Sequence, residues 1–243
     1  MTLKGISVVL PAYNEEKFLP ATLKAIQKSR ERFASSNSLP TEIIVVNNAS
    51  TDKTEEVALS FGSRVVNHPI RNISSVRNAG INSATFDLII MIDADSFLPE
   101  DALTKVFDVM ASGKILGGAF GVKVLTEKLS MKILAFIIQS VVTQVSGMSG
   151  AMFFFQKDAA LKIGGFREDR LIAEDSAFAM ALSALAKKDK KRFIRFPSVQ
   201  VGTLDRKEMT PRLLGSILLQ ILQAITGRKQ KSEDLTYWYD PKR

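Results

Sequence analysis

The segment Leu88-Ile89-Ile90-Met91-Ile92-Asp93-Ala94-Asp95 joins an unbroken apolar run to two closely spaced acids. An apolar run of this length, rich in β-branched residues, is typical of a buried strand with both faces covered, as in a parallel sheet. Open α/β sheets bind their ligands at the carboxyl ends of such strands. Two carboxylates there repel each other unless a positive group, such as a divalent metal carrying phosphates, lies beside them. The segment therefore indicates an α/β fold and metal-assisted nucleotide chemistry.

The sequence on either side of this segment alternates between strand-like and helix-like patterns. Such alternation predicts βαβ units in a mainly parallel sheet flanked by helices. After Gly117-Gly118 the pattern changes to further strands and helices that would complete the same sheet, and no Pro/Gly/Ser-rich linker separates the halves. We therefore expect one domain. The expected strands are 6–10, 43–46, 64–66, 88–92, 119–125 and 151–156, and the expected helices are 15–32, 54–61, 74–84, 99–110, about 130–145, a short one before Gly164-Gly165-Phe166, and one from Glu174.

The composition excludes several classes of site. The chain has 243 residues and no cysteine, so disulfides, thiolate metal sites and cysteine nucleophiles are excluded. The net charge of +8 comes largely from basic clusters in the C-terminal third, without the interleaved aromatic residues that stack on bases, so we expect no nucleic-acid partner. The first residues pass directly into a predicted strand and leave no room for a signal peptide, which favours a cytoplasmic location.

A stretch from Leu213 to Ile225 predicts an amphipathic helix with basic residues at both ends. It lacks the roughly 18 consecutive apolar residues that a membrane span requires. Such a helix can lie as a peripheral contact on the inner face of a membrane. It can equally pack on its own domain or on a second copy in a homodimer. The apolar stripe contains Leu214, Ile217, Leu218, Ile221, Leu222 and Ile225, and the basic residues are Arg212, Arg228, Lys229 and Lys231.

Three further polar segments follow predicted strands or open predicted helices: Pro11-Ala12-Tyr13-Asn14, Asn47-Asn48-Ala49-Ser50, and Arg77-Asn78-Ala79-Gly80. Taken alone, the first is a turn with an Asn helix cap, the second is ordinary turn chemistry, and the third contains a surface arginine. A parallel sheet would bring all of them to the edge where Asp93 and Asp95 lie. Amides, hydroxyls and free backbone N–H groups at this edge suit a base or a phosphate.

In this order and spacing, the segments resemble the inverting glycosyltransferases of family 2. The resemblance covers about residues 5 to 205 and implies an α/β fold with a single GT-A domain, the nucleotide-diphospho-sugar transferase fold. It implies a donor-binding half at about 1–115 and an acceptor and catalytic half at about 116–205. The residue pattern described above adds the amphipathic helix and a basic tail at 206–243. The matching segments are 7–16, 45–52, Arg77-Asn78-Ala79-Gly80, Asp93-Ala94-Asp95, Gly150-Ala151 through Gly164-Gly165-Phe166, and Glu174-Asp175.

The resemblance also implies roles for individual residues. Asp95 would bind a divalent metal, Mn²⁺ or Mg²⁺, which neutralises the leaving nucleoside diphosphate. Asp175, with its neighbour Glu174, would supply the catalytic base, because an acceptor hydroxyl is a poor nucleophile until a carboxylate takes its proton. The alternative for these two acids is an ordinary helix N-terminus. The nucleotide-sugar would be bound by Pro11, Ala12, Tyr13, Asn14, Asn48, Arg77, Asp93 and Ala94.

The chain departs from the family pattern in several places. Asn47-Asn48 replaces the usual Asp-Asp after the second strand, so the donor base stays open, with a UDP-sugar favoured and a GDP-sugar as the alternative. The Q-x-x-R-W motif of processive members is absent, which favours transfer of a single sugar. The one histidine, His68, is expected at the surface rather than at the metal, and Asp205 lies in the region where many members supply a late ligand.

We therefore expect metal-dependent, inverting, non-processive transfer of one sugar from a nucleotide-sugar to a hydroxyl of a glycan or lipid-linked acceptor, in cell-envelope polysaccharide or glycolipid synthesis. A sugar-nucleotide pyrophosphorylase is an alternative, but it should open with a glycine-rich loop and a downstream lysine, which residues 11–14 do not provide. A non-catalytic nucleotide-binding or membrane-peripheral scaffold is another. The intact Asp93, Asp95 and Asp175 argue against the scaffold.

Overall fold

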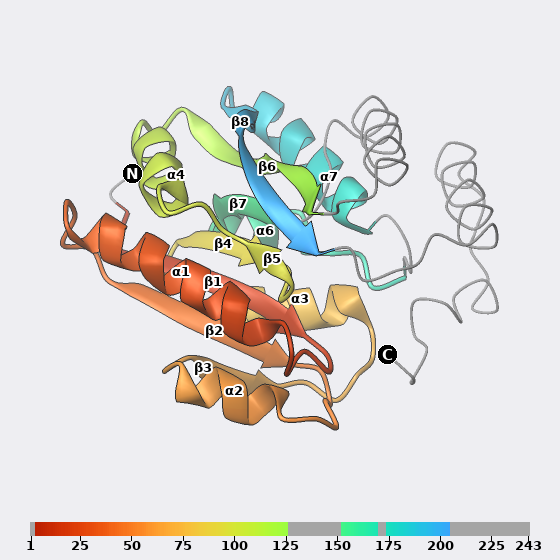
Figure 1. Ribbon diagram of the computed structural model, residues 1–243. Coiled ribbons are helices and arrows are strands. Elements are labelled where there is room, and N and C mark those ends of the chain that lie inside the picture. Colours follow the sequence, from red (N-terminus) through yellow and green to blue (C-terminus); the bar gives the residue numbers. More distant parts are fainter. Residues whose placement is uncertain (1–2, 126–151, 170–173, 205–243) are drawn as a thin grey trace.

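Eight strands form one sheet, in the order β3-β2-β1-β4-β7-β6-β8-β5 (Figure 1). The computed structural model describes residues 3–125, 152–169 and 174–204. The strands are β1 (Ile6–Ala12), β2 (Thr41–Asn47), β3 (Arg64–Asn67), β4 (Leu88–Ile92), β5 (Ser96–Phe97), β6 (Ile115–Leu125), β7 (Met152–Gln156) and β8 (Arg192–Leu204). The helices are α1 (Leu19–Ala34), α2 (Thr54–Ser60), α3 (Ile73–Ser83), α4 (Ala102–Ala111), α6 (Lys157–Lys162) and α7 (Glu174–Lys188).

The strands from the N-terminal part of the chain pair in parallel, as predicted. Strand β1 pairs in parallel with both β2 and β4, and β2 pairs in parallel with β3. Strand β7 then joins β4 and β6 in antiparallel pairing, while β6 and β8 are parallel. Strands from before and after residue 115 therefore belong to the same sheet.

The apolar run 88–92 forms β4, and its side chains alternate between the two faces of the sheet. Leu88 and Ile90 pack in the cluster that contains the apolar side chains of α1 and α4. Ile89 and Met91 pack in the second cluster, with side chains of α3 and α7. Each of these side chains is at most 2% exposed. Burying such a side chain stabilises the fold by roughly 1.5–3 kcal/mol, which explains why the strand is apolar throughout.

Two glycines expected to precede a strand lie inside one. Gly117 and Gly118 belong to β6, which begins at Ile115. A Cβ on Gly118 would collide with the Ile194 carbonyl oxygen and the Phe154 ring, so glycine is needed for close packing within the sheet. The interpretation of this pair as a boundary was therefore wrong.

Strand β8 was not predicted, because its sequence begins among basic residues and contains Pro197. Its pairing with β6 shifts register between Phe120, which faces Phe196, and Gly121, which faces Gln200. The shift leaves residues 197–199 without partners on β6, so the proline, which has no N–H to donate, lies at an irregularity in the ladder.

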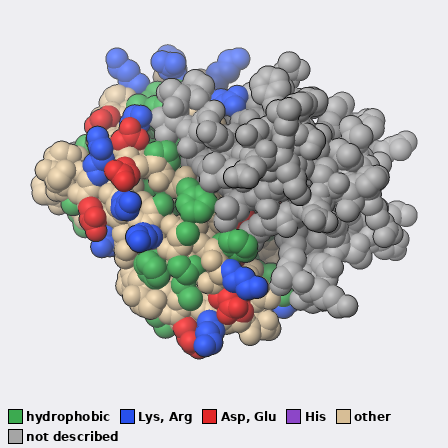
Figure 2. All heavy atoms as spheres, in the orientation of Figure 1, with side chains coloured by type: hydrophobic (Ala, Val, Ile, Leu, Met, Phe, Trp, Pro, Cys, Tyr) green, Lys and Arg blue, Asp and Glu red, His purple; other side chains and the backbone are tan. Residues whose placement is uncertain are grey.

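Helix α1 begins at Leu19, four residues later than expected. Its N-cap is Phe18, so the prediction of Asn14 as the helix cap was wrong. Asn14 adopts a left-handed backbone conformation with φ of 53°. The predicted helices at about 130–145 and at 213–225, and Asp205, lie outside the described residues. Within the described ranges, no helix has both the length and the apolar character needed to cross a membrane. On the face in Figure 2, acidic and basic side chains are interspersed over the described part of the chain.

Candidate active site

The carboxyl ends of β1, β2 and β4 bring the predicted site residues to one edge of the sheet. Ala12 lies opposite Asn47 in the register of β1 and β2, and the Asn48 N–H donates to the Ala12 carbonyl oxygen at 2.8 Å. Met91 lies opposite Val9 in the pairing of β4 with β1, so Asp93 leaves the sheet at the same edge. Parallel pairing thus produces the co-location that the sequence predicted.

Asn14 joins the loop after β1 to the loop after β2. Its Oδ1 accepts from the Thr51 N–H at 2.8 Å, and its own N–H donates to Ser50 Oγ at 3.1 Å. Nearby, the Glu16 N–H donates to Asp52 Oδ2 at 3.0 Å, and Glu16 Oε2 accepts from the Lys53 N–H at 3.1 Å. Side chains of the second loop therefore satisfy backbone donors that precede α1, and the two loops form one polar unit.

The adjacent Asn47 and Asn48 have different surroundings. The Asn47 side chain donates to Glu55 and Asn67 and accepts from the Ser50 N–H, so its amide is used in local structure. Asn48 Nδ2 instead donates to the carbonyl oxygens of His68, at 3.0 Å, and Ile70, at 2.7 Å. Because carbonyl oxygens can only accept, these two bonds determine the amide orientation and leave Oδ1 as the available acceptor.

The loop that holds Asn48 also carries a cation that the sequence did not single out. The Arg71 guanidinium lies 4.5 Å from the centre of the Tyr13 ring, in a cation–π contact. His68 Nε2 lies 2.9 Å from Ser75 Oγ, so the histidine contacts the start of α3. The position of Arg71, between a strand and a capped helix, was the available signal in the sequence. Its stacking on Tyr13 depends on the tertiary fold.

Arg77 links carboxylates from two other elements. Its Nη1 lies 2.6 Å from Glu174 Oε1 at the start of α7, and its Nη2 lies 3.2 Å from Asp93 Oδ1 after β4. The Arg77 side chain is 7% exposed and that of Glu174 is 13% exposed. The structure therefore brings three of the predicted residues into direct contact.

Burial and charge repulsion shape the titration of this cluster. The pKa of Asp93 is raised to about 7, because burial and the carboxylates of Asp95 and Asp175 together outweigh the lowering effect of Arg77. Burial also raises the pKa of Glu174, against the opposing charge of Arg77. Burial would lower the pKa of Arg77, but the surrounding carboxylates raise it, so the guanidinium stays charged. The acids around Arg77 outnumber it, and this surplus favours a further cation.

The two acids of α7 make different contacts. Glu174 is bound to Arg77, whereas Asp175 Oδ1 accepts from the Ser176 N–H at 2.6 Å. Both lie in the first turn of α7, where the helix dipole favours negative charge. The ion pair with Arg77 nevertheless ties Glu174 to the end of β4, which an ordinary helix N-terminus does not require.

The described residues contain no group of three or more His, Cys, Asp or Glu side chains that could hold a metal ion by themselves. Asp93 and Asp95 supply carboxylate oxygens, the ligand type that Mg²⁺ and Mn²⁺ prefer. In nucleotide sites Mg²⁺ is commonly held by one or two carboxylates together with substrate phosphates and water. The donor set therefore fits a cation shared between the protein and a diphosphate.

Ala94, between the two aspartates, is 3% exposed. Its carbonyl oxygen accepts from Thr22 Oγ1 of α1 at 2.7 Å. The turn that carries Asp93 and Asp95 is thereby anchored to the helix layer below it. Pro11 and Ala12 are likewise buried at the end of β1. These residues shape the site through their backbone.

Solved glycosyltransferase structures share this fold. The mannosyltransferase PcManGT of Pyrobaculum calidifontis, solved with GDP-Man and Mn²⁺, has a TM-score of 0.67 and 18% identity, covering 97% of this chain and 67% of that one. The glucosyl-3-phosphoglycerate synthase of Mycobacterium tuberculosis, solved with Mn²⁺, UDP-glucose and phosphoglyceric acid, has a TM-score of 0.64 and 16% identity, covering 94% and 81%. At these identities the likeness establishes the fold alone, and it confirms the predicted GT-A fold.

Relatives with similar sequences carry glycosyltransferase names. The undecaprenyl-phosphate 4-deoxy-4-formamido-L-arabinose transferase of Photorhabdus laumondii is 30% identical over 158 residues, covering 60% of this chain and 46% of that protein. The poly-beta-1,6-N-acetyl-D-glucosamine synthase of Staphylococcus epidermidis is 28% identical over 200 residues, covering 74% and 46%. This chain thus spans about half the length of these relatives.

The family model described as "Glycosyl transferase family 2" matches residues 7–166, which is more than half of the chain. The match begins at the second residue of β1, contains α1 through α3 and the Asp93-Ala94-Asp95 turn, and ends at Phe166 in the loop after α6. The segments that suggested the resemblance therefore lie within the matched region, apart from the acids of α7. The chain belongs to glycosyl transferase family 2.

Proposed function

We propose that this chain transfers a single sugar, with inversion, from a nucleotide-sugar to a hydroxyl of a glycan or lipid-linked acceptor, in cell-envelope polysaccharide or glycolipid synthesis. The observation that carries the proposal is the contact of Arg77 with Asp93 on one side and Glu174 on the other. This contact joins the strand edge expected to hold the donor to the helix expected to hold the base. Asp95 and Asp175 belong to the same charged cluster.

Asp175 is the proposed catalytic base. The acceptor oxygen forms a bond to the anomeric carbon while the bond from that carbon to the diphosphate oxygen breaks, and the hydroxyl proton passes to the Asp175 carboxylate. A single displacement of this kind inverts the anomeric carbon. Glu174 is the weaker candidate, because Arg77 already holds its carboxylate at 2.6 Å. Its proposed role is to orient the start of α7.

Asp95 is the proposed ligand for Mn²⁺ or Mg²⁺. When bound, the cation supplies Lewis-acid neutralisation of the charge on the leaving diphosphate. Asp93, whose carboxylate Arg77 holds at 3.2 Å, is the proposed contact to the nucleotide-sugar, and Arg77 acts on the donor through it. The Mn²⁺ complexes of the similar structures support a divalent cation.

Asn48 supports a donor whose base carries an imide-type N–H. Its Nδ2 is occupied by the carbonyls of His68 and Ile70, so Oδ1 is the acceptor offered to a ligand. Uracil N3–H and guanine N1–H can donate to it, whereas the corresponding ring nitrogens of cytosine and adenine are acceptors. We therefore propose a UDP-sugar, with a GDP-sugar as the alternative. Tyr13 and Asn14 would line the same site, with the backbone of Pro11, Ala12 and Ala94 completing it.

The proposal of a glycan or lipid-linked acceptor is supported by the sequence and by the names of similar proteins. One similar protein is named an undecaprenyl-phosphate transferase, which supports a lipid-linked acceptor. The proposed membrane contact, or alternatively a homodimer contact, is the predicted helix at 213–225, outside the described residues. Co-sedimentation of the full chain and of a chain ending at residue 212 with anionic vesicles tests the membrane contact. Equal binding by both would contradict it.

The decisive experiment is a panel of nucleotide-sugars assayed for transfer and slow hydrolysis, with and without Mn²⁺. We expect turnover of a UDP- or GDP-sugar that requires the cation. D95A and D175A should each abolish turnover while the protein stays folded. D108N, which alters an exposed acid on α4, is the matched control and should keep full activity. Unchanged turnover in D95A or D175A would refute the corresponding role, and no turnover of any donor by the unaltered chain would refute the proposed function.

A further inference from the structure

Asn78 of α3 forms a two-way pair with the backbone of Phe166, in the loop between α6 and α7. Its Oδ1 accepts from the Phe166 N–H at 2.7 Å, and its Nδ2 donates to the Phe166 carbonyl oxygen at 2.9 Å. Nδ2 also donates to Glu168 Oε1 at 3.0 Å. The side-chain amide thus pairs with this residue as a neighbouring strand would, and the opposite polarities of the two bonds determine its orientation.

The loop is shaped to accept this pairing. Gly165 has φ of 72°, a conformation that side chains other than glycine rarely adopt, and a Cβ there would collide with Asn78 Oδ1. Two residues beyond Phe166, the Glu168 carbonyl oxygen accepts from Asn72 Nδ2 at 3.0 Å. Asn72 is the N-cap of α3 and also accepts from the Ser75 N–H. The first half of α3 therefore holds residues 165–168 at several points.

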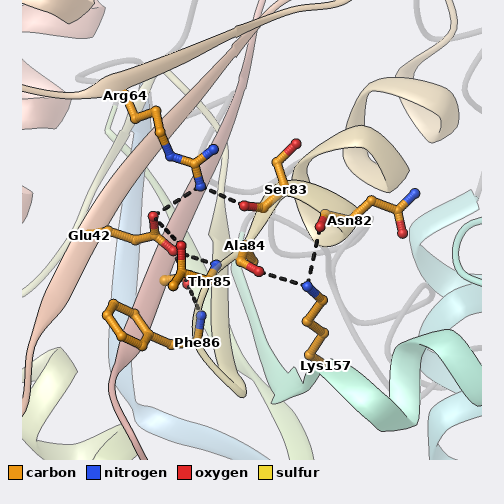
Figure 3. A network of polar contacts seen from close by, with 9 residues as sticks. Glu42, Arg64, Asn82, Ser83, Ala84, Thr85, Phe86 and Lys157 are labelled. Carbon is orange, nitrogen blue, oxygen red and sulfur yellow. Dashed lines mark hydrogen bonds and ion pairs between the residues drawn. The ribbon is translucent and has the colours of Figure 1, made fainter.

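The far end of α3 is held by the start of α6 (Figure 3). Lys157 Nζ donates to the carbonyl oxygens of Asn82, at 3.2 Å, and Ala84, at 2.7 Å. Arg64 Nη2 donates to the Ser83 carbonyl oxygen at 2.5 Å. Cations at a helix C-terminus satisfy its last carbonyls and complement the helix dipole. The segment from 157 to 168 is thus attached to α3 at both of its ends.

Phe166 connects the loop to α7 through a ring contact. Its ring stacks on Phe178 with centroids 3.9 Å apart and planes 7° from parallel. The guanidinium of Arg77 lies 5.2 Å from the same ring. Phe178 stands one helical turn beyond Glu174, which Arg77 binds directly. The neighbours Arg77 and Asn78 therefore hold the first turn of α7 by two routes, one through charge and one through the Phe166 backbone.

We infer that Asn78 is a positioning residue for sugar transfer, acting through Phe166 to set the place of Glu174 and Asp175 relative to Asp93 and Asp95. This inference rests on the proposed function and adds a residue that has no assigned part in donor binding. A misplacement of about 1 Å in reacting groups can lower a rate roughly 100-fold, so a hydrogen-bonded amide at this junction can influence the chemical step strongly.

The test compares N78A and N78D with N82A, which alters an exposed asparagine on the same helix. The quantities to be measured are kcat and donor KM for the active nucleotide-sugar, the affinity for UDP or GDP with Mn²⁺ by calorimetry, and Tm. For N78A we expect kcat to fall roughly 10- to 100-fold. Donor KM and nucleotide affinity should stay within about twofold of the unaltered chain, and N82A should match that chain throughout.

N78D keeps the acceptor for the Phe166 N–H but loses both donated bonds and places a carboxylate near Glu168. It retains the size of asparagine, so it serves if N78A does not fold. In N78D/E168Q the glutamine amide can donate to the new aspartate, and we expect this double variant to recover part of the lost kcat. Recovery of kcat at unchanged nucleotide affinity separates positioning from general destabilisation.

Several results would overturn the inference. A kcat within about twofold of the unaltered chain in folded N78A or N78D would do so. A loss of nucleotide affinity as large as the loss of kcat would also do so, as would the absence of any recovery in N78D/E168Q. No turnover by the unaltered chain with any nucleotide-sugar would overturn the proposed function and this inference with it. An active chain with an equally active N78A overturns this inference alone.

Discussion

Arg77 Nη1 lies 2.6 Å from Glu174 Oε1, although 97 positions separate the two residues in the chain. The contact crosses from α3 to α7, and the same guanidinium reaches Asp93 at the end of β4. The donor edge of the sheet and the first turn of α7 are therefore joined by one buried side chain. Changes at Arg77 should affect both stability and catalysis.

R77A should destabilise the protein by about 3 kcal/mol, because it leaves the buried Glu174 carboxylate without its partner. R77K should restore little, since a single ammonium cannot bridge two carboxylates in the way a planar guanidinium does. Both variants should lower kcat/KM. Chemical denaturation measures the free energy of unfolding, and K105A, which breaks an exposed pair with Asp101, should cost less than about 1 kcal/mol. Equal losses in R77A and K105A would contradict the prediction.

N48D introduces the acid that family members usually carry, yet it should lower both the stability of this protein and its affinity for the nucleotide. The aspartate would lose the donor to the carbonyl oxygens of His68 and Ile70 and would place negative charge beside them. We expect a loss of roughly 1–3 kcal/mol in the free energy of unfolding and weaker binding of UDP or GDP. N37D is the control, because the side-chain hydrogen bond from Asn37 to Ser36 is exposed. A more stable N48D would show that the amide orientation does not matter.

Asp95 should be required for cation-dependent stabilisation. A ligand that binds the folded state alone raises stability by about 2.7 kcal/mol at 100 times its Kd. Mn²⁺ together with UDP or GDP should therefore raise the Tm of the unaltered chain and of D108N but not of D95A. Removal of the cation with a chelator should abolish the shift. A full rise in Tm in D95A would show that Asp95 is not needed to bind the cation.

Glu42 gives a pH dependence that is independent of the active site. Burial would raise its pKa, but hydrogen bonds from Ser7, Thr85 and Arg64 outweigh burial and hold the pKa below the ordinary value of 4.5. Figure 3 shows Thr85 and Arg64 beside the Glu42 carboxylate. A carboxyl whose folded pKa is lowered stabilises the fold above its unfolded pKa, and this contribution is lost as the pH falls through the folded pKa.

E42Q should therefore be less stable than the unaltered chain at pH 7, and the difference should shrink as the pH falls below about 4.5. Denaturant titrations across this range measure the difference. E56Q, at an exposed glutamate of α2, should show neither effect. A difference between E42Q and the unaltered chain that stays constant down to pH 3 would be inconsistent with the lowered pKa.

G165A should be more destabilising than G62A. Both glycines have positive φ, 72° and 69°, so both substitutions pay for a strained backbone, of order 1–3 kcal/mol. A Cβ at Gly62 has nothing within 4 Å, whereas one at Gly165 meets Asn78 Oδ1. The difference between the two free energies of unfolding therefore reports the contact with Asn78. Equal losses would mean that the loop moves aside at little cost.

Local sequence patterns were sufficient for much of the fold. The apolar run 88–92 coincides with β4, because burial on both faces imposes an apolar residue at every position. The predicted strands at 6–10 and 43–46 lie within β1 and β2. Parallel pairing then places Ala12, Asn47 and Asp93 at one edge, a consequence that follows from the order of the elements alone. The family and the type of chemistry could be inferred from this edge.

Other features required the three-dimensional arrangement. Strand β8 could not be predicted from its sequence, because Pro197 and the neighbouring basic residues are unusual in a strand. Its irregular pairing with β6 accommodates the proline. Gly117 and Gly118 resemble a boundary in the sequence, because a glycine needed for close packing looks the same there as one that ends an element. Such distinctions depend on neighbours that the local sequence does not contain.

The roles of Asp93, Asp95, Glu174 and Asp175 remain predictions, but their relationship was decided by packing. The family resemblance implied a common site for Arg77 and the acid pair, but no local pattern indicated that Arg77 and Glu174 are in direct contact. Arg77 binds Glu174, and Asn78 binds Phe166, because α3 lies between β1 and the loop before α7. Strand order follows from short-range patterns of burial, whereas the partner of a buried charge depends on which distant segments fold against it.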